Sequence, residues 1–138
     1  MDTFFSTIYY YTRDLYSQEL DNYLYETVPG YIHVGLVMVI LSAIIAVLFY
    51  YILKPVRKQM FIWLGCLFLN ALLNLIVAIW YTNTPLINNE IDESDIWTVI
   101  DTFGFGVANI IWSILFFILV SIFIKNWSPA KYIPFKKF

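Results

Sequence analysis

The hydrophobic positions of this chain fall into three long, uninterrupted stretches, at residues 31–53, 60–81 and 103–124. None of the three contains Asp, Glu, Lys or Arg. As a helix, each stretch would be roughly 33 to 35 Å long, enough to cross a hydrocarbon core of about 30 Å with some tilt. The bilayer core offers no water to backbone groups, so stretches of this kind cross it as helices. We therefore predict an all-α, polytopic integral membrane protein with three transmembrane helices.

The first 30 residues carry a different pattern. They hold six of the eleven tyrosines, and a helical projection places most apolar and aromatic side chains on one face. We expect an amphipathic helix that lies in the membrane interface and ends at Pro29-Gly30. The alternative is that the tyrosine-rich face docks a partner, because tyrosine offers a large contact area at little entropic cost. The candidate contact residues are then Tyr9, Tyr16 and Tyr23.

The charged residues, 13% of the chain, are sorted by sign along it. All ten acidic residues precede the first span or lie between the second and third, whereas seven of the eight basic residues follow the first or third span. Short loops rich in Lys and Arg stay in the cytoplasm. We therefore expect the N-terminus outside and the C-terminus inside, with a net charge of −9 outside and +7 inside. The expected location is a cell inner (cytoplasmic) membrane.

Residues 125–138 combine four lysines with aromatic residues and two prolines. Because proline opposes helix, we expect an extended strip along the inner membrane surface, where Trp127, Tyr132 and Phe135 are candidate partner contacts. The chain thus divides into a tyrosine-rich amphipathic outer-surface segment (1–30), a three-helix transmembrane domain (31–124) and a basic, aromatic cytoplasmic tail (125–138).

Polar residues interrupt the spans at helical spacing. Asn70 and Asn74 are four residues apart, as are Asn109 and Ser113, so each pair lies on one helix face. Counting from the span centres in opposite chain directions places Asn74 level with Asn109, and Asn70 level with Ser113 and Ser42. We expect these five residues, the polar seam, to join the helices by hydrogen bonds. In the alternative interpretation, the asparagines line a lumen or a subunit interface.

Two further expectations concern the outer boundary of the third span. Ser94 or Asp95 is the expected helix cap, and Gly104-Phe105-Gly106 is an expected kink. His33 and Asp101 both fall near this boundary, where such residues usually only mark the interface, although a pair of them would respond to pH.

Reactive groups are scarce. One histidine (His33) and one cysteine (Cys66) cannot form a zinc site, a haem ligand pair or a disulfide. The sequence has no glycine-rich phosphate loop, and no charged residue within the spans to carry a proton relay. The acidic segment 88–95 lacks the glycine and terminal glutamate of an EF-hand loop. We therefore expect no enzymatic activity, no cofactor and no nucleic-acid partner.

These observations predict a non-catalytic membrane subunit that anchors or scaffolds a larger membrane protein complex of the secretion, envelope or respiratory machinery. Its expected partners are other membrane protein subunits and the lipid bilayer. One alternative is a homo-oligomeric small channel or transporter, in which several copies turn the polar seam of the second and third spans toward a shared axis. Another is a receptor or regulator whose acidic outer side binds a cationic partner.

Overall fold

A computed structural model describes residues 2–53, 58–91 and 96–128, and this part of the chain is helical, with no strands. Three of its helices are long and apolar enough to cross a membrane, which confirms a multi-pass membrane protein by length and composition. The spans consist of α3 (Gly30–Val47) with its π-helical extension η3 (Leu48–Leu53), of α4 (Gln59–Ile87), and of α5 (Val99–Ile124) with the short 3₁₀ turn η5 (Lys125–Trp127).

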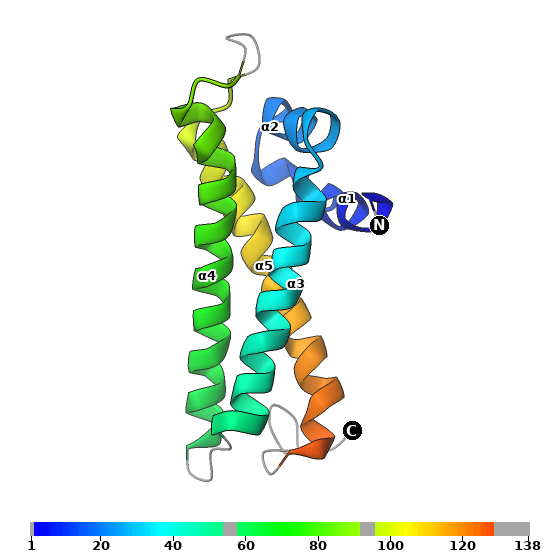
Figure 1. The fold of residues 1–138 in the computed structure, drawn as a ribbon, viewed down its shortest axis with the longest axis vertical. Coiled ribbons are helices and arrows are strands. Elements are labelled where there is room, and N and C mark those ends of the chain that lie inside the picture. The colour runs from blue at the N-terminus through cyan, green and yellow to red at the C-terminus, as the bar shows by residue number, and fades with distance from the viewer. Residues whose placement is uncertain (1, 54–57, 92–95, 129–138) are drawn as a thin grey trace.

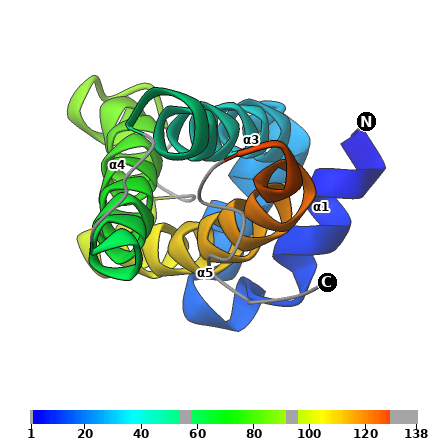
Figure 2. The ribbon, with the colours of Figure 1, turned by 90° about the horizontal axis from the view of Figure 1, so that it is seen from below.

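The three long helices pack against one another in pairs, and α5 passes behind α3 (Figure 1). Seen along the long axis, α3, α4 and α5 form a three-sided bundle, and α1 lies outside it beside α3 and α5 (Figure 2). Two clusters of buried apolar side chains fill this arrangement. One lies at the end that carries the N-terminal residues and includes Tyr9 and Phe105, and the other lies at the opposite end around Phe49, Trp63 and Phe117.

The second and third spans are longer than predicted. α4 continues past Tyr81 to Ile87 although Pro85 lies inside it, and Asn89, with a φ of 52°, follows the end of the helix. α5 begins at Val99, four residues before the predicted start, since Thr98 caps it. The expectation that Ser94 or Asp95 caps this helix is wrong: both lie outside the described residues, but residues 96–98 are not helical and the cap is Thr98. The hydrophobic pattern missed these extra turns because they carry polar side chains.

The N-terminal residues do not form one amphipathic helix. They form four short pieces, called here the N-terminal subdomain: α1 (Asp2–Tyr10), the 3₁₀ turn η1 (Arg13–Leu15), α2 (Gln18–Asn22) and the π-helical η2 (Tyr23–Thr27). The chain turns at Tyr16, whose backbone is extended, and Ser17 then caps α2 by accepting a hydrogen bond from the Leu20 amide. This turn lets Tyr9, Leu20 and Leu24 all reach the core, where each is buried.

Candidate functional site

The polar seam lies at the centre of the three-helix bundle. Its five side chains come from α3, α4 and α5, and all are fully buried: Ser42, Asn70, Asn74, Asn109 and Ser113. The spacing of four residues on α4 and on α5 turns each pair toward the helix interface. Buried polar groups at this position need hydrogen-bond partners within the protein, because neither lipid tails nor apolar side chains can donate or accept hydrogen bonds.

Direct hydrogen bonds link the seam across the helices. Ser42 Oγ donates to Asn70 Oδ1 at 3.2 Å, and Asn70 Nδ2 donates to the Ser113 carbonyl at 3.0 Å. Within α4, Asn74 Nδ2 donates to the Asn70 carbonyl at 2.9 Å, and between helices Asn109 Nδ2 donates to the Asn74 carbonyl at 2.9 Å. The structure thus places Asn70 beside Ser113, and Asn74 beside Asn109. Two of these interhelical hydrogen bonds have backbone carbonyls as acceptors. Matching polar side chains by their level in the sequence does not predict such acceptors.

One seam atom is an exception. Among the described residues Asn74 Oδ1 is buried and has no hydrogen-bond partner. A buried acceptor without a donor costs on the order of 1 to 3 kcal/mol, whereas an interhelical hydrogen bond in a membrane contributes about 0.6 kcal/mol. Asn74 is therefore held mainly by the bonds that its Nδ2 donates and its carbonyl accepts.

The seam continues into the N-terminal subdomain through Tyr9. The Tyr9 hydroxyl donates to Asn109 Oδ1 at 2.5 Å, across 100 positions of sequence, and the side chain is fully buried. A second link lies nearby, where Trp112 Nε1 donates to Thr12 Oγ1 at 3.2 Å. Both contacts connect the subdomain to α5, and neither was predicted from the sequence. The only sequence features that point to these contacts are Asn109 and Trp112, an amide and a tryptophan inside the predicted third span.

Four aromatic side chains pack together where the subdomain meets α3 and α5: Tyr9, Tyr16, Tyr31 and Phe105. The hydroxyls of Tyr16 and Tyr31 are 2.8 Å apart, and the Tyr31 hydroxyl also donates to the Asp21 carboxylate. Tyr9 stacks on Tyr31, with ring centroids 5.1 Å apart, and both rings contact Phe105. Burial raises the pKa of Tyr9 and of Tyr16 above the ordinary value of 10.0. The neutral phenols are therefore strongly favoured in the docked subdomain.

Two glycines permit this close approach. A Cβ on Gly104 would lie 1.8 Å from the Leu15 carbonyl oxygen, and one on Gly35 would lie 2.2 Å from the Phe5 ring. Gly104 was expected to kink the third span with Gly106, but α5 runs unbroken through both. Instead, the lack of a side chain at Gly104 allows η1 to pack directly on the backbone of α5.

The six predicted partner-contact residues differ in how far the structure buries them. Tyr9 and Tyr16 are buried inside the chain, and this corrects their assignment as contact surface. Tyr23 is partly buried and packs on Trp97, with ring centroids 4.7 Å apart. Trp127 is 77% exposed. Tyr132 and Phe135 lie outside the described residues.

The two ionisable residues His33 and Asp101, expected near one membrane boundary, make separate contacts. His33 Nδ1 lies 2.8 Å from the Tyr81 hydroxyl, joining α3 to α4. The Asp101 carboxylate instead accepts hydrogen bonds from the amide and hydroxyl of Thr98, which completes a capping box at the start of α5. Asp101 also accepts hydrogen bonds from Ser17 of the N-terminal subdomain, so it both caps α5 and contacts the subdomain, whereas His33 joins two helices.

Over residues 2–53, 58–91 and 96–128, no group of three or more His, Cys, Asp or Glu side chains is placed to hold a metal ion. The chain was also compared with family models, with curated proteins and with solved structures, and none of them matches it.

Proposed function

We propose that this multi-pass membrane protein is a non-catalytic subunit that anchors or scaffolds a larger membrane protein complex, as in secretion, envelope or respiratory machinery. The observation that carries the proposal is that the polar seam is closed within one chain. Its five side chains are fully buried and bonded to one another or to neighbouring backbone carbonyls. Groups used in this way stiffen a structural unit, and the outer helix faces are left for contacts with lipid and other subunits.

The exposed helix faces support the same proposal. Large apolar side chains cover them on each span, among them Ile40 on α3, Phe68 on α4 and Phe123 on α5. In a bilayer such faces contact lipid or a neighbouring transmembrane helix. The bundle is also tied to its N-terminal subdomain by the Tyr9 to Asn109 hydrogen bond, so a partner would meet a single, preorganised surface.

The orientation and location form part of the proposal. Seven of the eight basic residues would lie on the cytoplasmic side of an inner membrane, together with the C-terminus. The N-terminal subdomain, which carries most of the tyrosines, would then lie on the outer side and contribute to subunit contacts there. Three exposed tyrosines, Tyr10, Tyr11 and Tyr25, are the contact candidates that its folded form leaves available.

Crosslinking in intact membranes tests the scaffold proposal. A photoreactive residue at Ile40, Phe68 or Phe123 should give a discrete crosslink to another membrane protein from at least one position. The same residue at the fully buried Phe117 should give none, which makes it the matched control. Gentle detergent extraction that returns only a monodisperse monomer, with no crosslink from any exposed position, would overturn the proposal.

The channel alternative makes a different prediction from the same residues. If several copies turned the asparagines toward a shared axis, Asn70→Leu together with Asn74→Leu would abolish ion flux in reconstituted vesicles. On the scaffold proposal the unaltered protein conducts no ions, and the double variant only loses stability, because the bonds to Ser113 and to Asn70 itself are removed. Flux above that of empty vesicles that disappears in the double variant would favour the channel.

A further inference from the structure

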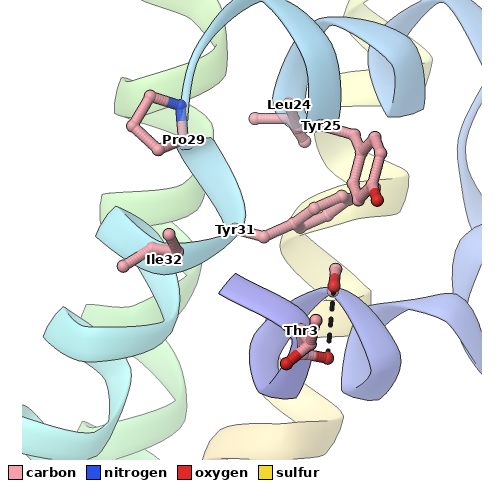
Figure 3. A pocket seen from close by; sticks show the side chains of 7 residues that line it. Thr3, Leu24, Tyr25, Pro29, Tyr31 and Ile32 are labelled. Carbon is pink, nitrogen blue, oxygen red and sulfur yellow. Dashed lines mark hydrogen bonds between the residues drawn. The ribbon is translucent and has the colours of Figure 1, made fainter. Parts of the chain in front are cut away.

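Two adjoining cavities open between α1 and the segment that leads from η2 into α3. Their volumes are about 270 and 510 Å³, and they share Ser6, Tyr25 and Tyr31 as lining residues. Figure 3 shows Tyr25 and Tyr31 reaching toward each other from η2 and α3, with Thr3 of α1 close by. Together the two cavities form one tyrosine-lined cleft on the side of the N-terminal subdomain.

The lining of this cleft is aromatic with a single acidic group. Four tyrosines contribute, Tyr10, Tyr11, Tyr25 and Tyr31, and the acidic group is the Asp21 carboxylate. No Lys, Arg or His side chain lines either cavity. The rings of the first three tyrosines are 57%, 75% and 67% exposed, so the protein core does not use them.

This combination of groups selects for positive charge. The face of an aromatic ring attracts a cation within about 6 Å of its centre, and cages of such rings are the usual binding sites for quaternary ammonium groups. A carboxylate adds direct charge complementarity and would disfavour an anion. We propose that the cleft binds an organic ammonium group, with the rings of Tyr11 and Tyr25 on its faces and Asp21 as its counter-charge.

The chain already uses one of these rings for a cation. The Arg13 guanidinium carbon lies 4.3 Å from the centre of the Tyr10 ring. Arg13 therefore occupies one ring face at the edge of the cleft and repels a second positive charge nearby. Its removal should strengthen the binding of an ammonium ligand, which is the opposite of what loss of a lining residue should do.

The position of the cleft beside the start of α3 allows two sources for the ammonium group. Phe5 of α1 packs on Gly35, five residues into α3, or roughly 7 Å along the helix axis. The first turns of a spanning helix lie near the membrane surface, where interfacial helices meet headgroups and acyl chains. The ammonium can therefore belong to a choline or ethanolamine lipid headgroup, or to a free amine that enters from water.

The test uses the full-length protein in a maltoside detergent, titrated with choline and with its neutral carbon isostere, in which a tert-butyl group replaces trimethylammonium. Choline should bind at least about tenfold more tightly, and Tyr25→Leu should weaken it about fivefold. Tyr25→Phe keeps the ring and should stay within about twofold. Trp80→Leu removes an equally exposed aromatic residue that lines neither cavity and should change nothing.

Two charge variants complete the design. Asp21→Asn keeps an acceptor for the Tyr31 hydroxyl but removes the counter-charge, so choline binding should weaken, whereas Arg13→Ala should strengthen it. Equal binding of choline and its isostere, no choline binding at all, or equal effects of Tyr25→Leu and Trp80→Leu would overturn the proposal.

A comparison of vesicles separates the two sources. Protein in phosphatidylglycerol vesicles, which offer no ammonium headgroup, should bind free choline. If phosphatidylcholine vesicles suppress that binding, the lipid headgroup occupies the same cleft. If they leave it unchanged, the site serves free amines. Failure to bind choline in phosphatidylglycerol vesicles would contradict the site for either source.

Discussion

The Tyr9 hydroxyl of α1 donates a hydrogen bond to Asn109 Oδ1 of α5, and the two side chains are fully buried. This bond joins a subdomain at one end of the molecule to the polar seam at the centre of the bundle. Asn109 in turn donates to the Asn74 carbonyl of α4. The subdomain is thereby connected to both helices through one asparagine.

Removing that hydroxyl tests the connection. Tyr9→Phe should lower the free energy of unfolding by about 1 to 2 kcal/mol, because the ring still packs but Asn109 Oδ1 is left buried without a donor. Tyr10→Phe, at a tyrosine that is 57% exposed, is the matched control and should have little effect. Denaturant titration in detergent measures both. Equal stability of the two variants would show that the bond contributes nothing.

A glycine pair tests the docking of η1 on α5. Gly104→Ala places a Cβ 1.8 Å from the Leu15 carbonyl oxygen, so the subdomain must shift away. Gly65→Ala meets nothing within 4 Å and should be neutral or slightly stabilising, since alanine favours helix. Arg13 is the only basic residue before Lys54, so tryptic cleavage after it reports on an open subdomain. We expect about tenfold faster cleavage in the Gly104 variant only; equal rates would contradict the docked arrangement.

The seam could be predicted from the sequence much further than the subdomain. The spacing of Asn70 with Asn74 and of Asn109 with Ser113 fixes a helix face, and consecutive spans cross a bilayer in opposite directions, so the levels of these residues follow from counting. Nothing comparable fixes Tyr9. Its position depends on how four short helical pieces turn and on the missing side chain of Gly104, and both are set by tertiary packing.

Alkaline pH should release the subdomain. Burial raises the pKa of Tyr9 and Tyr16 above 10.0 in the docked form, whereas both would ionise near 10.0 once exposed. Above that pH the open form binds fewer protons than the docked form, so docking is at full strength below about pH 10 and weakens as pH rises further. Tryptic cleavage after Arg13 should accelerate over that range.

The control for this pH effect removes one of the two ionisable groups. Tyr16→Phe eliminates its ionisation and should make the acceleration less steep, after correction for the pH dependence of trypsin on an unfolded substrate. Tyr11→Phe, at a tyrosine that is 75% exposed, should leave the profile unchanged. A profile identical in all three proteins would assign the effect to other groups.

Cysteine labelling tests the proposed orientation, and the chain offers a matched pair of positions for it. Asn88 and Asn126 are both exposed at helix ends, one after α4 and one after α5, and the native Cys66 is buried and can be replaced by alanine. With the N-terminus outside, residues 82–102 face the exterior and the C-terminal end of α5 faces the cytoplasm. A membrane-impermeant maleimide added to intact cells should therefore label Asn88→Cys and spare Asn126→Cys until the membrane is opened. The reverse result would invert the topology, and labelling of both positions in sealed cells would contradict a single membrane span, α5, between Asn88 and Asn126.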